Sequence, residues 1–99
     1  MAPVPRPPSG HFNILYFASA SSFTKKEYES LAAPLPLGKL FQTLDGRYSG
    51  MKARILDSCM VTINLEYIDV PTVEGGQGGD EVVIKEGDEV AIIPPVSSG

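Results

Sequence analysis

The chain has 99 residues, 42% of them apolar, and a formal net charge of −4. This size suits one domain with a single modest core. Its eight Lys and Arg residues are scattered and no apolar run approaches roughly 20 residues, which argues against nucleic-acid binding and against a membrane-spanning helix. A lone cysteine excludes an internal disulfide, and the N-terminal residues lack the apolar stretch of a secretory signal, so we expect a location in the cytosol (cytoplasm).

The N-terminal third is read from its apolar spacing. Residues 1–10 contain four prolines and no apolar period, which predicts a disordered lead-in. Residues 12–20 carry apolar side chains at both parities, which is typical of an interior strand or of a strand whose second face meets a partner. Residues 19–26 are polar and predict a turn. Residues 27–33 fit either a second strand or the start of a helix, and propensity alone does not decide.

The central part contains the clearest helical signal. Five apolar side chains recur at the spacing of one helical face: Leu37, Leu40, Phe41, Leu44 and Tyr48. They predict a helix over 37–48, with Pro36 acceptable in its first turn. Gly38 weakens the early part by about 1 kcal/mol relative to alanine, so this helix needs tertiary packing. A shorter second helix is predicted over 51–58.

The remainder of the chain predicts strands and turns. Residues 59–70 alternate in the strand period, and alternation alone predicts one long strand. Residues 74–80 are a loop by composition. Residues 81–84 predict a short extended piece, Gly87 and Asp88 a turn, and residues 89–94 the last strand.

Several candidate sites have a simpler structural reading. Cys59 has no histidine partner, because His11 is the only one and lies at the end of the lead-in, so a small core residue is the better interpretation. The glycine-rich residues 75–79 lack the Gly-Lys-Ser/Thr ending of a phosphate loop. The carboxylates show no assignable acid/base pair, and no metal-ligand spacing is found, so we expect no metal. Asp88 and Glu89 fit a solvated turn.

The end of the chain combines unusual features. The last strand enters Pro94 and Pro95, whose fixed φ angles hold the exit extended. Three small or slender residues follow, Val96, Ser97 and Ser98, and the chain stops at Gly99. Such a thin segment can enter a narrow cleft on another protein, so residues 95–99 are interpreted as a functional tail.

Three segments carry a resemblance: residues 14–18 (ILYFA), 61–68 (VTINLEYI) and 85–95 (KEGDEVAIIPP). Together they resemble the small, sulfur-carrier subunit of molybdopterin synthase over roughly residues 12–99. The resemblance implies an α+β fold, a ubiquitin-like β-grasp with a mixed sheet packed on one main helix, over residues 11–94. It also implies a strand over 27–33, a tight turn near residues 64–66, and a last strand beside the first. The family ends in Gly-Gly, whereas this chain ends in Ser98-Gly99.

The resemblance also implies a chemistry for the tail. A separate activating enzyme would use ATP to adenylate Gly99, and a thiocarboxylate would then form there. Its sulfur would pass to cyclic pyranopterin monophosphate in molybdenum cofactor biosynthesis, inside a heterotetramer of two small and two large catalytic subunits. The small subunit would be a sulfur donor without a bound cofactor, rather than the catalytic subunit. The alternatives are a ubiquitin-like protein modifier or interaction module, or a sulfur carrier for thiamine or tRNA thiolation.

A docking surface follows from the predicted sheet. One helix covers only one of the two sheet faces, yet Phe17, Tyr67 and Ile93 have the opposite parity to the expected core. We therefore expect these three side chains to belong to an apolar patch that the large subunit covers.

Overall fold

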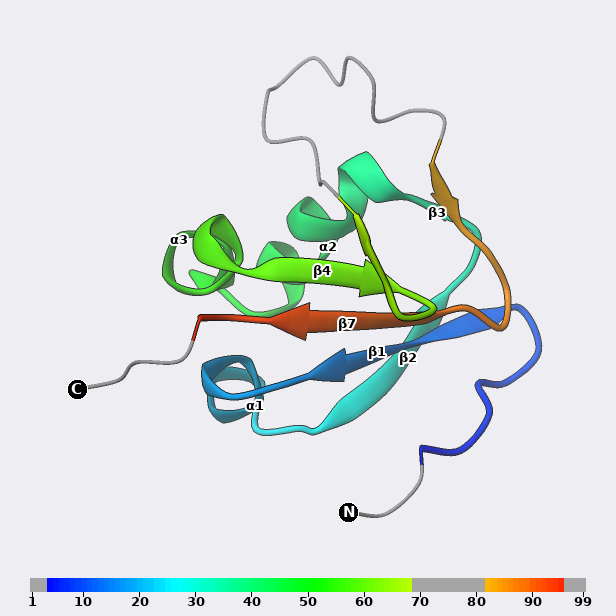
Figure 1. The fold of residues 1–99 in the computed structure, drawn as a ribbon, viewed down its shortest axis with the longest axis horizontal. Helices are drawn as coiled ribbons and strands as arrows, with labels where there is room; N and C mark the ends of the chain where they lie inside the picture. Colours follow the sequence, from blue (N-terminus) through cyan, green and yellow to red (C-terminus); the bar gives the residue numbers. More distant parts are fainter. Residues whose placement is uncertain (1–3, 69–81, 96–99) are drawn as a thin grey trace.

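Five strands form the main sheet, in the order β2-β1-β7-β4-β5 (Figure 1). The computed structural model describes residues 4–68 and 82–95. The strands span Tyr28–Ala32 (β2), His11–Tyr16 (β1), Glu89–Ile93 (β7), Met60–Ile63 (β4) and Glu66–Ile68 (β5). Because β7 pairs in parallel with β1 and antiparallel with β4, the last strand lies in the middle of a mixed sheet, beside the first strand as expected.

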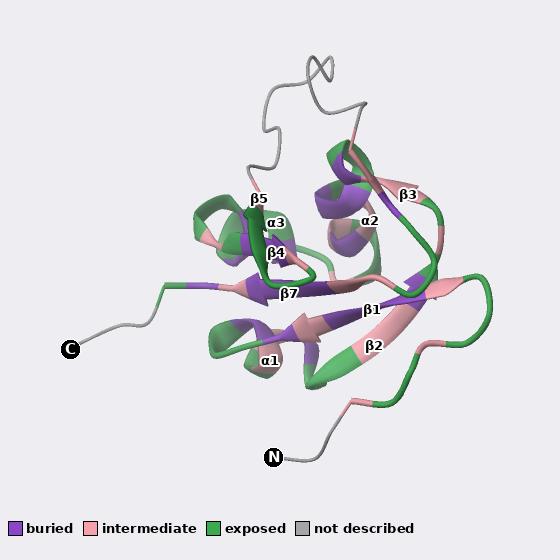
Figure 2. Cartoon of the chain, turned by 45° about the vertical axis from the view of Figure 1, so that its right-hand side comes forward, coloured by how far each residue is buried: buried purple, intermediate pink, exposed green. Residues whose placement is uncertain are grey.

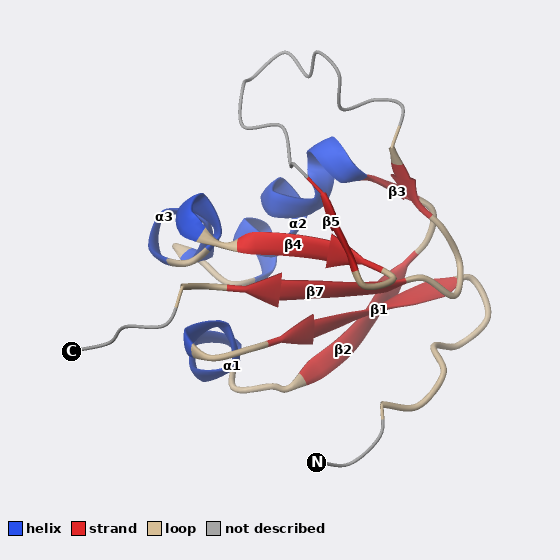
Figure 3. Ribbon diagram, viewed as in Figure 1, coloured by secondary structure: helices blue, strands red, loops and turns tan. Residues whose placement is uncertain are grey.

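The helices are short and span Ser19–Thr24 (α1), Leu40–Arg47 (α2) and Met51–Arg54 (α3), with 3₁₀ turns at Leu37–Lys39 (η1) and Leu56–Ser58 (η2). Helices α2 and α3 lie against the sheet (Figure 3). A second, two-stranded sheet pairs β3 (Leu35–Pro36) with β6 (Val83–Ile84). The expected α+β architecture, a mixed sheet with one main helix, is confirmed.

The predicted turn over residues 19–26 is wrong, because α1 occupies most of it. Ala18 has a φ of 52°, which ends the strand direction of β1 and starts the helix. The helix is then fixed by tertiary contacts: Ala20 is fully buried, and the Thr24 hydroxyl donates to the Ala20 carbonyl at 3.0 Å. Four of the six α1 residues are Ser or Thr, so no apolar period announced it.

The helix predicted over 37–48 forms, but its first turn is 3₁₀ rather than α. Leu37 and Leu40 are buried as the spacing predicted, with Leu44 one turn further on. Pro36 is not a helical residue. It lies in β3 opposite Val83, a pairing that no local pattern in the sequence indicated. The second predicted helix divides into α3 and η2.

The β4–β5 hairpin confirms the tight turn expected at residues 64–66. Asn64 and Leu65 both have positive φ, 52° and 72°, as the two central residues of a type I′ hairpin turn require. Positive φ is disfavoured for a residue with a Cβ, so Leu65 keeps this conformation at a cost in free energy. Strand alternation continues across the turn, which is why the period alone predicted one strand.

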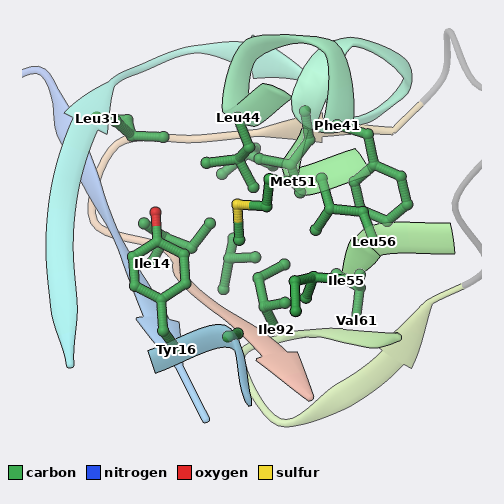
Figure 4. Close-up of a cluster of buried hydrophobic side chains, with 14 of the residues drawn as sticks. Ile14, Tyr16, Leu31, Phe41, Leu44, Met51, Ile55, Leu56, Val61 and Ile92 are labelled. Carbon is green, nitrogen blue, oxygen red and sulfur yellow. The ribbon is translucent and has the colours of Figure 1, made fainter. Parts of the chain in front are cut away.

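One hydrophobic core lies between the main sheet and the helices (Figure 4). The inward residues of the central strands, Ile14 and Ile92, meet Leu44 of α2 and Met51 of α3, and all four are fully buried. Figure 2 shows the buried residues running along β1 and β7, whereas most of the edge strand β5 is exposed. Strand β7 is therefore held rigidly on both sides, and its end is a fixed point for the tail.

Candidate functional site: the tail exit and the outer sheet face

The tail leaves the sheet from the end of its central strand, β7. Val90 and Ile92 of β7 are fully buried, Pro94 is buried, and Pro95 is exposed. The surface of the domain is therefore reached at the second proline. The expected tail residues Val96, Ser97, Ser98 and Gly99 lie outside the described residues.

Two helices lie at the same end of the sheet as the exit (Figures 1 and 2). Helix α1 follows β1, which runs parallel to β7, so α1 begins where β7 ends. Helix α3 and η2 precede β4, which runs antiparallel to β7, so they reach the same end. The Phe17 amide donates to the Ile92 carbonyl at 3.1 Å and ties the start of α1 to the exit.

The sheet face opposite the core, here called the outer face, is rich in apolar side chains. One row across the strands is set by register and contains Tyr28, Leu15, Ala91, Thr62 and Tyr67. In the next row, toward the tail exit, Ile93 is paired with Met60. Phe17 follows Leu15 by two residues, so its side chain lies on the same face, just beyond the end of β1. The predicted residues Phe17, Tyr67 and Ile93 thus share one face. That a partner covers them stays a prediction.

Two further exposed apolar residues of the outer face were missed from the sequence. Tyr28 is 40% exposed and Met60 is 58% exposed, comparable with 36% for Phe17 and 70% for Tyr67. In a strand, alternate side chains lie on opposite faces, so residues 28–32 and 60–63 contain the information that places Tyr28 and Met60 on the outer face. This information could be used only once both segments were known to be strands. We call Phe17, Tyr28, Met60, Tyr67 and Ile93 the outer patch.

The N-terminal segment also contacts the outer face, near Asn13. This side chain is only 6% exposed although it points away from the core, and its Nδ2 donates to the Pro5 carbonyl at 2.6 Å. Gly10 donates its amide to Glu86 Oε2 at 2.6 Å. Residues 4–10, expected to form a lead-in apart from the domain, therefore make contacts that their composition did not predict. Residues 1–3 lie outside the described residues.

The Gly87-Asp88-Glu89-Val90 stretch of the segment 85–95 belongs to a polar cluster at the other end of the sheet. The Asn64 side chain accepts from the Glu89 amide at 3.0 Å and donates to Asp88 Oδ1 at 3.1 Å, while Asp88 Oδ2 accepts from the Lys85 amide at 2.8 Å. Gly87 has a φ of 86°, which glycine adopts without the Cβ penalty. These residues join the β4–β5 turn to the start of β7, so their role is to fix the position of β7.

A second polar cluster surrounds Glu29 of β2, whose side chain is 9% exposed. The hydroxyls of Tyr16 and Tyr48 donate to Oε2, the latter at 2.6 Å. Lys26 and Arg47 contact Oε1 at 3.1 and 3.3 Å. Burial raises the pKa of Glu29, but the hydrogen bonds outweigh burial and leave its pKa below the usual value. The cluster holds an ionised carboxylate that stabilises the edge strand.

Cys59 is a structural residue, as expected. It is half-buried, packs against the core, and its thiol donates to the Leu56 carbonyl at 3.4 Å. Burial raises its pKa to about 11, so the thiol is protonated at neutral pH and is a weak nucleophile. Within residues 4–68 and 82–95, no group of three or more His, Cys, Asp or Glu side chains could hold a metal ion. In the same ranges, every helix is too short or too polar to cross a membrane.

Comparison with known proteins gives a consistent family assignment. The model of the ThiS family matches residues 14–99. The molybdopterin synthase sulfur carrier subunit of Phaeosphaeria nodorum is 60% identical over 92 residues, which are 93% of this chain and 94% of that protein. The protein of the same name from Pyrenophora tritici-repentis is 54% identical over the same shares of the two chains.

Solved structures with this fold include both enzyme subunits and modifiers. A chain in the complex of subunits 1 and 2 of molybdopterin-converting factor from Helicobacter pylori has a TM-score of 0.57 and 21% identity, covering 90% of this chain and 99% of that one. The small archaeal modifier protein 1 of H. volcanii has a TM-score of 0.66 and 20% identity, covering 89% and 100%. At these identities the likeness shows the β-grasp fold alone.

Proposed function

Because this chain belongs to the ThiS family, we propose that it is the sulfur-carrier subunit of molybdopterin synthase. The observation that supports this most directly is the exit of β7: this central, largely buried strand ends in Pro94-Pro95 beside an exposed apolar face. A rigid base, a thin tail and a surface for a partner are the features that a carrier needs. In this proposal the reacting group is the carboxyl of the chain terminus, Gly99.

The proposed chemistry begins with activation of Gly99. A terminal carboxyl has a pKa of about 3.3–3.7, so at neutral pH it is an anion and a poor electrophile. Attack of the carboxylate on the α-phosphorus of ATP, in a separate activating enzyme, releases pyrophosphate and forms an acyl-adenylate. A persulfide sulfur then displaces AMP, and a second thiol cleaves the sulfur–sulfur bond, leaving a thiocarboxylate on the carrier.

The thiocarboxylate is the proposed nucleophile in the large subunit. A fully extended stretch of five residues reaches roughly 17 Å at about 3.3–3.6 Å per residue, so a tail of this length can place the sulfur inside a partner. The sulfur forms a bond to a carbon of the cyclic pyranopterin monophosphate, and the oxygen substituent of that carbon leaves. Water then cleaves the acyl–sulfur bond of the resulting thioester, so the sulfur stays on the pterin and the carrier regains its free carboxylate. Two sulfurs are needed for each dithiolene, so each product requires two carriers or two charging cycles of one carrier, within a proposed complex of two small and two large subunits.

The test of the tail uses a reconstituted synthase assay. Removing Gly99, or appending residues after it, should abolish thiocarboxylate formation and molybdopterin synthesis while thermal unfolding stays unchanged, because Pro95 already lies outside the core. An N-terminal extension of equal length is the matched control and should retain activity. Synthesis by the truncated chain at the parent rate would refute the proposal. Conjugation of the charged chain to lysines, without synthesis, would support the modifier alternative.

The test of the outer patch measures binding of the large subunit. Phe17→Ala and Ile93→Ala should each weaken binding by about 2 kcal/mol, roughly thirtyfold, as is typical of a central apolar anchor. Leu65→Ala is the control, because Leu65 is 85% exposed but lies in the turn at the opposite end of β7 from the tail. Parent-like affinity of both patch variants would show that the large subunit docks elsewhere.

A further inference from the structure

A shallow depression lies between α1 and α3, outside the outer patch. Ser19, Ser22 and Phe23 of α1 line one side, and Arg54 with Ile55 lines the other. Ile55 is buried and Phe23 packs against the core, so the floor is apolar and firmly held. Two hydroxyls and one guanidinium surround this floor.

The depression is at the tail-exit end of the sheet. Helices α1 and α3 lie at the end where β7 terminates, and two views show them on either side of the chain as it leaves (Figures 1 and 2). Ser19 is two residues beyond Phe17 of the outer patch, whose amide bonds to β7. A partner that covers Phe17 and takes in the tail therefore also reaches the depression.

The charge of the depression is positive and uncompensated within the described part of the chain. No carboxylate there lies within 4 Å of the Arg54 guanidinium, which is also true of Arg6, Lys25, Lys39 and Lys85. What distinguishes Arg54 from these cations is its place beside Phe23 and Ile55 in the depression. The chain as a whole is acidic, with a net charge of −4. An exposed cation beside hydroxyl donors on an apolar floor suits an Asp or Glu side chain flanked by apolar atoms, because a guanidinium can bind a carboxylate through two parallel hydrogen bonds.

We propose that the depression formed by Ser19, Ser22, Phe23, Arg54 and Ile55 binds an acidic side chain of the large subunit, next to the entrance through which that subunit takes the tail. This inference rests on the proposed function, since it names a contact of the same complex. The outer patch is apolar, so the contact at Arg54 adds a directional charged interaction to the same interface. It fixes the rotation of the carrier about the tail, which an apolar patch alone defines weakly.

Binding of purified large subunit to the full chain, measured by calorimetry at low and high salt, tests the contact. Arg54→Ala should weaken binding about three- to tenfold, and Arg54→Glu should weaken it more, because a partly exposed charge pair is worth little when lost but like charges repel. Arg54→Lys should recover part of the affinity. Lys39→Glu changes the net charge equally at an exposed residue of η1 and should bind like the parent.

The salt dependence gives a second readout. Parent affinity should fall more steeply with ionic strength than the affinity of Arg54→Ala, since the variant lacks the screened pair. Equal affinity of parent and Arg54→Glu at low salt would overturn the inference while leaving the proposed function intact. Normal binding with impaired thiocarboxylate formation would also overturn it and assign the depression to the activating enzyme. Failure of the parent chain to bind would refute both proposals.

Discussion

Removing the carboxylate of Glu29, a largely buried side chain on the edge strand β2, should strongly destabilise the domain. Two hydrogen bonds, from the hydroxyls of Tyr16 and Tyr48, end on one of its oxygens. Hydrogen bonds to a charged group contribute about 1.5–3 kcal/mol each, and a buried hydroxyl left without an acceptor adds a desolvation penalty. The ion pairs with Lys26 and Arg47 contribute much less, because both cations are about half exposed.

We expect Glu29→Ala to lower the free energy of unfolding by about 3–5 kcal/mol, since Tyr16 is 3% exposed and keeps its hydroxyl inside the fold. At about 4–8 °C per kcal/mol for a domain of this size, Tm should fall by at least about 12 °C. Chemical and thermal denaturation measure both quantities. Glu27→Ala, at an exposed neighbouring position, should stay within about 0.5 kcal/mol of the parent. A loss below 1 kcal/mol for Glu29→Ala would refute the reasoning.

The pH dependence of stability separates the charge from the packing of Glu29. Its pKa is lowered in the folded state, so its ionised form stabilises the fold above the unfolded pKa of about 4.3. That stabilisation is lost as pH falls through the folded pKa. The side chain introduced by Glu29→Gln cannot titrate. The free energy of unfolding of this variant should therefore lie furthest below that of the parent near pH 7, and the difference should shrink below about pH 4. A difference in the free energy of unfolding that does not change with pH would show that the packing of the Glu29 side chain, and not its charge, causes the effect.

Three further predictions concern the turn and the tail. Asn64→Ala should lower the free energy of unfolding by about 1–3 kcal/mol, because it removes the hydrogen bonds to the Glu89 amide and to Asp88. An unchanged denaturation midpoint would contradict this structural role. Leu65→Gly should raise stability by about 1 kcal/mol, because glycine relieves the positive φ of an exposed residue, and a lower Tm would refute this. Ser98→Gly should increase both thiocarboxylate formation, measured by mass spectrometry, and molybdopterin yield, because serine disfavours positive φ and adds a Cβ. Equal thiocarboxylate formation in the parent and the variant would show that glycine is dispensable at this position.

Secondary structure could be predicted from the sequence where one local period dominated. The helix over 37–48 and the strand over 89–94 follow from apolar spacing, because each buries one continuous face. Helix α1 could not be predicted, since its Ser-rich sequence has no apolar period and its stability comes from Ala20 and Thr24 inside the fold. The pairing of Pro36 with Val83 joins residues far apart in sequence, which no local pattern specifies.

The candidate site divides in the same way. The sequence by itself determined the thin terminal segment, the two prolines and the opposite parity of Phe17, because these are properties of residue type and spacing. Only the tertiary structure decided that β7 lies between β1 and β4. Its last residue, Ile93, is therefore paired with Met60, and its exit lies between helices α1 and α3 (Figures 1 and 2). The physical reason is that strand pairing and helix packing bring together segments that are distant in the chain, and their charges and exposed surfaces become neighbours only then.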